Sequence, residues 1–201
     1  AASDDPQVRD LAQLVRAEAL LVSDVTAAVE QLDLLVDSPN QLVWTKAAQR
    51  LATWLVRQQR TDEAVQLLER VVDGGHPLLV PWSAAQLGDL LVEHGEPEDV
   101  IAAFATAAGA GYPSLLAEVF GKLEVLYRIA GHDEELEALY RTAIDSGQPE
   151  LVPRASYLLG EKLALADQPG AALEHFERAA GAESEVAALA AFGAHAVRGD
   201  L

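Results

Sequence analysis

Apolar residues recur along this chain with a period of 36 residues. The column that marks the repeat most clearly is a leucine, at Leu51, Leu87, Leu123 and Leu159. Five further columns keep the same spacing, namely Ala52, Gly88, Glu124 and Gly160; Leu55, Leu91, Tyr127 and Leu163; Ala64, Val100, Leu136 and Ala172; Leu68, Phe104, Tyr140 and Phe176; and Val71, Ala107, Ala143 and Ala179. A weaker upstream copy has apolar residues in the same phase at Val15, Ala19, Ala28, Leu32 and Leu35. Columns that stay in phase over several copies indicate an internal repeat.

The apolar spacing within each repeat predicts two helices joined by a turn. Apolar residues fall at i and i+4 in the first half and at i, i+4 and i+7 in the second half, which is one face of a helix. Gly95 and Gly131 lie where a left-handed residue would end the first helix. The second helix is then expected to begin at Thr61, Pro97, Asp133 and Pro169. Gly-x-Pro segments at 75–77, 111–113 and 147–149 separate one repeat from the next.

These signals predict eleven helices and no strand, over about 7–22, 24–37, 41–58, 61–73, 80–94, 97–109, 114–130, 133–146, 151–166, 169–181 and 184–198. Ala190, Phe192 and His195 continue the phase of a first helix, so we expect the last helix to cover the open end of the stack. The predicted fold class is all-α, a right-handed α-solenoid of about five helix-turn-helix repeats plus a C-terminal capping helix. We expect one domain over 1–201, with repeats at about 9–40, 45–76, 81–112, 117–148 and 153–182.

The composition indicates an acidic chain with a packed core. Half of the 201 residues are apolar, and 32 acidic residues against 14 Lys and Arg leave a net charge of −18. This balance disfavours nucleic acid and anionic membrane surfaces as partners, because both require clustered cations. No run of apolar residues is long enough for a transmembrane span, and the acidic N-terminus does not resemble a signal peptide, so we expect a cytoplasmic location. The excess negative charge is expected on the second helices and the linkers.

A search for catalytic patterns finds none that pairs a nucleophile with a base. The chain has no cysteine, and it lacks the P-loop, Gly-x-Ser-x-Gly and His-Glu-x-x-His motifs. The acidic clusters at 96–99 and 133–135 fall at expected helix starts, where carboxylates stabilise the helix dipole; a hard-cation site is the alternative reading. We therefore predict that the protein is not an enzyme and has no cofactor and no metal site.

The columns resemble the tetratricopeptide repeat (TPR). Its pattern of Leu-Gly, an aromatic residue or Leu, and then Gly, Ala, an aromatic residue and Ala is matched by Leu87-Gly88, Leu91, Gly95, Phe104 and Ala107. The fifth repeat matches as well, at Leu159-Gly160, Leu163, Ala172, Phe176 and Ala179. A period of 36 instead of 34 and the Gly-x-Pro linkers lean towards the related Sel1-like repeat. The resemblance implies a non-catalytic scaffold that binds a peptide or a partner domain in a concave groove.

In this family the first helix of each repeat lines the groove. The phase then assigns to the groove Lys46, Gln49, Thr53 and Arg57 in the second repeat, Trp82 and Asp89 in the third, Glu118, Val125 and Arg128 in the fourth, and Arg154, Tyr157 and Glu161 in the fifth. Arginine and aromatic residues are frequent hot spots of interfaces, and arginine can bind a carboxylate of an extended peptide. The alternative is that these residues are the polar face of a solenoid.

The function predicted from these features is a protein–protein interaction scaffold, as a segment of a larger bacterial protein. One alternative is a regulatory module that senses a peptide and controls an attached effector. Another is a self-assembling repeat domain, a homo-oligomer formed through apolar residues of the terminal helices, at Leu11, Leu14 and Leu20 or at Val186, Leu189 and Phe192.

Overall fold

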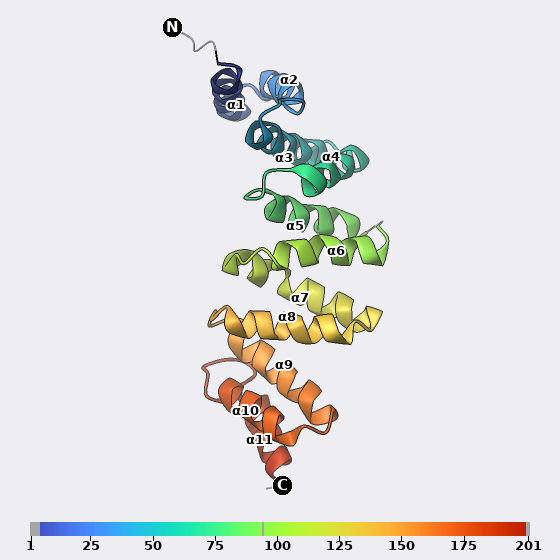
Figure 1. The fold of residues 1–201 in the computed structure, drawn as a ribbon, viewed down its shortest axis with the longest axis vertical. Helices are drawn as coiled ribbons and strands as arrows, with labels where there is room; N and C mark the ends of the chain where they lie inside the picture. The colour runs from blue at the N-terminus through green and yellow to red at the C-terminus, as the bar shows by residue number, and fades with distance from the viewer. Residues whose placement is uncertain (1–4, 94, 200–201) are drawn as a thin grey trace. The chain divides into compact units, whose positions relative to one another are not determined.

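Eleven helices and no strand make up the described part of the chain, residues 5–93 and 95–199 of the computed structural model (Figure 1). Within these residues, no helix is sufficiently long and apolar to cross a membrane. The predicted all-α class is confirmed. We call α1, α3, α5, α7, α9 and α11 the first helices and the others the second helices. The bounds are α1 Pro6–Ser23, α2 Val25–Leu35, α3 Gln41–Arg57, α4 Thr61–Gly74, α5 Val80–Leu91, α6 Pro97–Ala108, α7 Pro113–Ala130, α8 Asp133–Asp145, α9 Val152–Leu165, α10 Pro169–Ala180 and α11 Ala187–Arg198.

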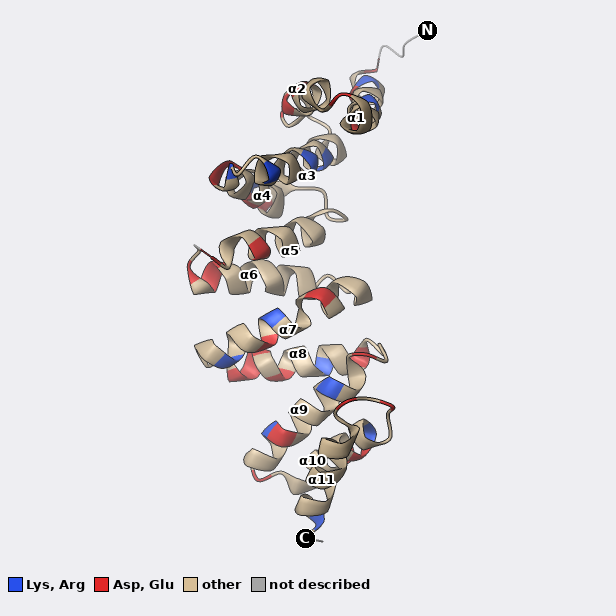
Figure 2. Ribbon diagram, turned by 180° about the vertical axis from the view of Figure 1, so that it is seen from behind, with Lys and Arg blue, Asp and Glu red and all other residues tan. Residues whose placement is uncertain are grey.

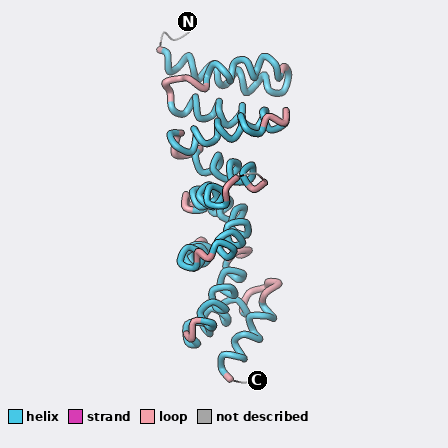
Figure 3. The backbone as a smooth tube through the Cα atoms, turned by 90° about the vertical axis from the view of Figure 1, so that its right-hand side faces the viewer, coloured by secondary structure: helices cyan, strands magenta, loops and turns pink. Residues whose placement is uncertain are grey.

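The helices group into two compact units, Ala1–Ala110 and Gly111–Leu201. In the N-terminal unit, α1 packs on α2, α3 on α4 and α5 on α6, and each pair packs on the next pair (Figure 3). In the C-terminal unit, α8 packs between α7 and α9, and α10 packs between α9 and α11. Each unit is thus a stack of helix hairpins. That the two units form one continuous domain over 1–201 stays a prediction.

The repeat columns form the core of both units. The marker leucines are buried, and so are the aligned second-helix residues, including Leu68, Phe104, Tyr140 and Phe176. Leu91 is the one member of the six columns that is only half-buried among the described residues. The helical periodicity therefore identified the buried face of each helix, because a face that recurs every 3.6 residues is the one that packs.

In the third and fifth repeats, a glycine of the first helix makes room for a ring of the second helix. A Cβ atom added to Gly88 would lie 2.7 Å from the Phe104 ring, and one added to Gly160 would lie 2.9 Å from the Phe176 ring. In the second repeat the corresponding pair is the larger Ala52 with the smaller Leu68. In these three repeats the smaller residue of one column accompanies the larger residue of the other, as close packing requires; the fourth repeat, with Glu124 and Tyr140, does not follow this pattern.

The turn inside the repeat follows the expected left-handed cap in three of four cases. Gly131 has a φ of 73°, and Gln59 and Asp167, in the same column, have φ values of 60° and 57°. In each case the next residue donates its N–H to a carbonyl five residues earlier, as a Schellman motif does. The expectation for Gly95 is wrong: its φ is not positive, and its own N–H donates to the Leu91 carbonyl at 2.6 Å. Helix α5 correspondingly ends at Leu91, before the expected boundary.

The first helix of the chain is out of the 36-residue register. Val15 and Ala19 were expected in the core, yet both are exposed, and the buried residues of α1 are Leu14 and Ala17. A single residue, Asp24, joins α1 to α2, whereas three residues join α3 to α4. The connection between the two helices of this first pair is thus two residues shorter than the one between α3 and α4. The prediction for α2 is confirmed, since Ala28, Leu32 and Leu35 are buried.

The last helix also departs from the predicted phase. Ala190 is buried as expected, but Phe192 and His195 are exposed, and Ala194 is the second buried residue of α11. Ala190 and Ala194 follow the buried Ser156 and Gly160 of α9 by 34 residues. The helix begins at Ala187 because residues 184–186 form a turn.

Candidate functional site

The predicted polar residues of α3 connect it to α5 by hydrogen bonds. The Gln49 side-chain amide donates to the Leu79 carbonyl at 3.1 Å and to Ser83 Oγ at 2.7 Å. The Gln86 amide donates to Thr53 Oγ1 at 3.4 Å. These hydrogen bonds connect α3 to α5, so Gln49 and Thr53 link one repeat to the next and their side chains are already ordered.

Two cations of α3 remain available on this surface. Lys46 is half-buried and Arg57 is exposed, and neither forms an ion pair or hydrogen bond within the described residues. The third cation of the helix, Arg50, is bound to Glu18 of α1 at 3.0 Å. In α5, Trp82 keeps 41% of its surface exposed and Asp89 is exposed. We call Lys46, Arg57 and Trp82 the α3–α5 surface.

The first helices and the second helices differ in net charge (Figure 2). Helix α3 has three basic residues and no acidic one, whereas α2 and α6 have acidic residues and no basic one. Helix α4 carries four acidic residues and one arginine, and α8 carries five and one. The expectation that the second helices carry the excess negative charge is confirmed. An acidic partner segment would accordingly be attracted to α3 and repelled by the second helices.

The C-terminal unit contains a buried carboxylate at a position where other repeats have Ala or Gly. Glu124 is only 3% exposed. Arg154 of α9 donates to its Oε2 at 2.9 Å, and Arg128 of α7 binds its Oε1. Arg128 also donates to the hydroxyl of Tyr140 at 3.4 Å, and the Arg154 guanidinium lies 5.6 Å from the centroid of the Phe120 ring. We call Glu124, Arg128 and Arg154 the carboxylate cluster.

The carboxylate cluster changes the role of two predicted groove residues. Arg128 and Arg154 were expected to bind a partner's carboxylate, and the structure brings both onto a carboxylate of the chain itself. Sequence reasoning missed Glu124 as a functional residue. The signal was present, since a charged residue in a column of Ala52, Gly88 and Gly160 needs a compensating partner when it is buried.

The remaining predicted residues of this unit lie on the surfaces of α7 and α9. Glu118 and Val125 are exposed. The Tyr157 hydroxyl donates to Glu161 Oε1 at 2.6 Å, and its ring centroid lies 6.0 Å from that of Phe176. The hydrogen bond to the Glu161 carboxylate, with smaller contributions from burial and charge, raises the pKa of Tyr157 to about 12.

The Tyr157 phenol should therefore lose its proton at a higher pH than an ordinary tyrosine does. Because its folded-state pKa lies above the ordinary value near 10, the protonated phenol stabilises the fold below about pH 10, and this contribution is lost as the pH rises through about 12. The measurement is the tyrosinate absorbance of the chain minus that of Tyr157→Phe. Glu161→Gln should lower the midpoint towards 10, whereas Glu150→Gln, an exposed carboxylate elsewhere, should not. A midpoint unaffected by Glu161→Gln would contradict the assignment.

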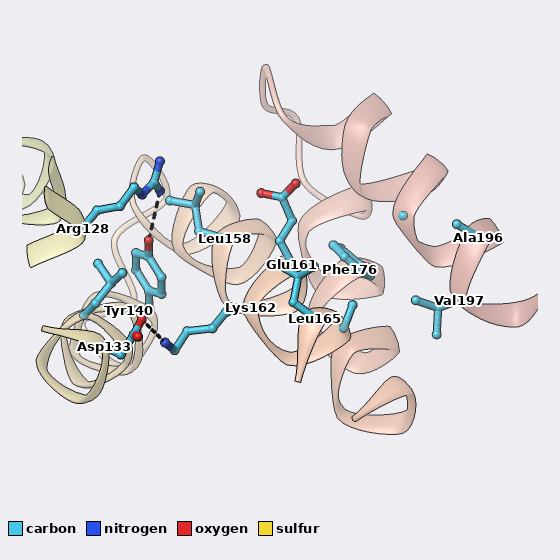
Figure 4. Close-up of a pocket in the computed structure, with 13 residues that line it drawn as sticks. Arg128, Asp133, Tyr140, Leu158, Glu161, Lys162, Leu165, Phe176, Ala196 and Val197 are labelled. Atoms are coloured by element: carbon cyan, nitrogen blue, oxygen red, sulfur yellow. Dashed lines mark hydrogen bonds and ion pairs between the residues drawn. The ribbon is translucent and has the colours of Figure 1, made fainter. Parts of the chain in front are cut away.

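A cleft of about 520 Å³ lies within the C-terminal unit beside α9 (Figure 4). Its apolar walls include Leu136, Leu158, Leu165, Phe176 and Val197. Lys162 reaches across from α9 to Asp133 of α8, with Nζ 2.7 Å from Oδ1, and Arg128 lies at the end near Tyr140. Over the described ranges, no group of three or more acidic or histidine residues is arranged to hold a metal ion.

The comparisons with known proteins concern the fold. No protein-family model and no curated protein matches the sequence. Among solved structures, YrrB, described as "a TPR protein with an unusual peptide-binding site", is 17% identical, with a TM-score of 0.55 over 90% of each chain. A crystal structure of MamA is 16% identical, with a TM-score of 0.52 over 89% of this chain and 94% of that one. The chain therefore has a TPR-like helical-repeat fold.

Proposed function

We propose that this chain is a protein-interaction scaffold and that its α3–α5 surface binds an extended acidic segment of a partner protein. The observation that carries the proposal is the pair of cations on α3, Lys46 and Arg57, which have no partner within the described residues. They belong to a helix that has no acidic residue in a chain whose net charge is −18. Carboxylates of a partner would complete charge-assisted hydrogen bonds at these two positions.

The neighbouring side chains suit an extended peptide. The exposed Trp82 offers a flat apolar surface of the kind that anchors peptide side chains at interfaces. Hydrogen bonds from Gln49 and Gln86 connect α3 to α5, so these side chains need little further ordering when a partner binds. The peptide-binding site ascribed to YrrB, a structure of similar fold, supports the same use of this scaffold.

The cleft beside α9 is proposed as a second contact region, with a different chemistry. Its apolar walls, and the exposed Val125 and Leu165 of the same unit, favour apolar side chains. Arg128, the arginine that lines the cleft, is engaged with Glu124, so we assign the recognition of carboxylates to α3 and the recognition of apolar groups to the cleft.

The double charge reversal Lys46→Glu/Arg57→Glu tests the proposal. Random dodecapeptides are displayed and selected on the unmodified chain, and the enriched peptides are expected to be rich in Asp and Glu. Their affinity for the double variant should fall about tenfold or more, since two attractions become repulsions. Arg9→Glu/Arg16→Glu on α1 makes the same change in net charge and should leave the affinity within about twofold. Equal losses in both variants, or none in either, would show that α3 is not the binding site.

A further inference from the structure

The cleft beside α9 leads from solvent down to buried side chains. Leu136, Tyr140 and Phe176 line it and are each at most 6% exposed, whereas Leu165, which also lines it, is 90% exposed. The cleft volume of about 520 Å³ lies within the range of roughly 300–1,000 Å³ that is typical of small-molecule sites. Such sites have mostly apolar walls and a few polar groups, and this cleft is built in the same way.

Helix α11 borders the cleft without filling it. The residues that it contributes to the lining are Gly193, Ala196 and Val197, and none of them has a side chain larger than that of valine. A Cβ atom added to Gly193 would lie 2.9 Å from the Phe176 ring, so the glycine allows the α11 backbone to lie against that ring. On this side the cleft is therefore bordered by backbone and small side chains.

The charged side chains that line the cleft are all paired within the C-terminal unit, two of the contacts being drawn in Figure 4. The pairs are Lys162 with Asp133, Arg128 with Glu124 and with the Tyr140 hydroxyl, and Glu161 with the Tyr157 hydroxyl. A charged ligand would have to break one of these pairs or enter the apolar cleft with its own charge unpaired, and either is costly. An uncharged ligand does neither.

We propose that this cleft binds an uncharged, apolar small molecule. The inference rests on the second contact region proposed above, which assigns the cleft to apolar groups, and it adds that a free ligand of this class is bound there. A small molecule in the cleft and an apolar side chain of a partner would exclude each other. The ligand would therefore regulate this second contact and leave the α3–α5 surface unaffected.

A fluorescence titration of the full chain with N-phenyl-1-naphthylamine tests the site. This dye is uncharged, and its emission rises in apolar surroundings. Val197→Asp places an unpaired carboxylate in the cleft and Ala164→Trp places a large ring there, so each should weaken dye binding about tenfold or more. Ile129→Asp is the matched control, because Ile129 is an exposed apolar residue of the same unit outside the cleft lining. Its affinity for the dye should stay within about twofold of that of the unmodified chain.

Displacement of the dye by three compounds with the same naphthalene ring tests the ligand class. They are 1-naphthylmethanol, which is uncharged, 1-naphthylmethylammonium, a cation, and 1-naphthylacetate, an anion. The alcohol should displace the dye at a concentration about tenfold lower than either ion requires. The ammonium compound is the stringent comparison, because the net charge of −18 attracts cations to the chain.

Two outcomes would overturn the proposal. Dye binding that is absent, or that Val197→Asp and Ala164→Trp leave unchanged, would mean that the cleft is not a small-molecule site. Displacement by either ion at the concentration of the alcohol would mean that the ligand class is wrong. The proposed contact with a partner is tested separately, by the affinity of the selected peptides for Val197→Asp. Far-UV circular dichroism of each variant is the control for folding.

Discussion

The double variant Arg128→Ala/Arg154→Ala is expected to lower the free energy of unfolding by about 3 kcal/mol. Glu124 would then be left as a buried carboxylate with no cation beside it, and breaking a buried ion pair from one side costs roughly 3–5 kcal/mol. The lower end applies because both arginine side chains are more than half exposed, so water can replace part of their contribution.

A third substitution separates the charge from the lost packing. In the triple variant with Glu124→Ala, no buried charge remains, and alanine already occupies this column at Ala52. The triple variant should therefore recover most of the lost free energy of unfolding. If the triple variant is no more stable than the double variant, the arginines stabilise the unit by packing, and their attraction to the Glu124 carboxylate does not contribute.

The aromatic residues allow the two units to be followed separately. All three tryptophans, Trp44, Trp54 and Trp82, lie in the N-terminal unit, and all four tyrosines lie in the C-terminal unit. In urea, tyrosine absorbance should show the destabilisation of the arginine variant, while tryptophan fluorescence should not. Lys46→Ala/Arg57→Ala is the control, since it removes two cations that have no partner, and it should change stability by no more than about 0.5 kcal/mol.

Gly88→Ala is expected to lower the free energy of unfolding by about 2 kcal/mol. The added Cβ would lie 2.7 Å from the Phe104 ring, so the ring or the helix must move, and overpacking a core costs roughly 1–3 kcal/mol. Tryptophan fluorescence is the appropriate probe, because Gly88 lies in the N-terminal unit.

The second repeat provides the compensating change, because it pairs Ala52 with Leu68. In Gly88→Ala/Phe104→Leu, the two effects should be less than additive by about 1 kcal/mol. Gly121→Ala is the matched control: it also lies within a helix, but the nearest atom to its added Cβ is 3.9 Å away, so it should stabilise the chain by about 0.5–1 kcal/mol. If the effects of Gly88→Ala and Phe104→Leu on the free energy of unfolding are strictly additive, the Phe104 ring does not require a glycine at position 88.

The helices and their buried faces could be predicted because both depend on short-range pattern. Leu51 and Leu55 mark one face of α3 whatever the rest of the chain does, and Pro97 and Pro169 begin helices through their own fixed φ. The exposed position of Val15 could not be predicted in this way, because it depends on which face of α1 packs on its neighbours, and that face carries Leu14 and Ala17. The left-handed cap expected at Gly95 is also not found, and the Gly95 N–H instead donates to the Leu91 carbonyl.

The sequence by itself determined the repeat, the helix pairs and the core residues of the four 36-residue repeats, and it placed the excess acidic charge on the second helices. Only the tertiary structure decided which polar side chains form hydrogen bonds or ion pairs with other parts of the chain and which do not. Gln49 bonds to a residue 34 positions away, and Glu124 to one 30 positions away. Such contacts depend on how one repeat packs on the next, and periodicity within a repeat carries no information on that geometry. Lys46 and Arg154 belong to the same repeat column, yet Arg154 binds Glu124 of α7, whereas Lys46 has no such carboxylate partner within the described residues.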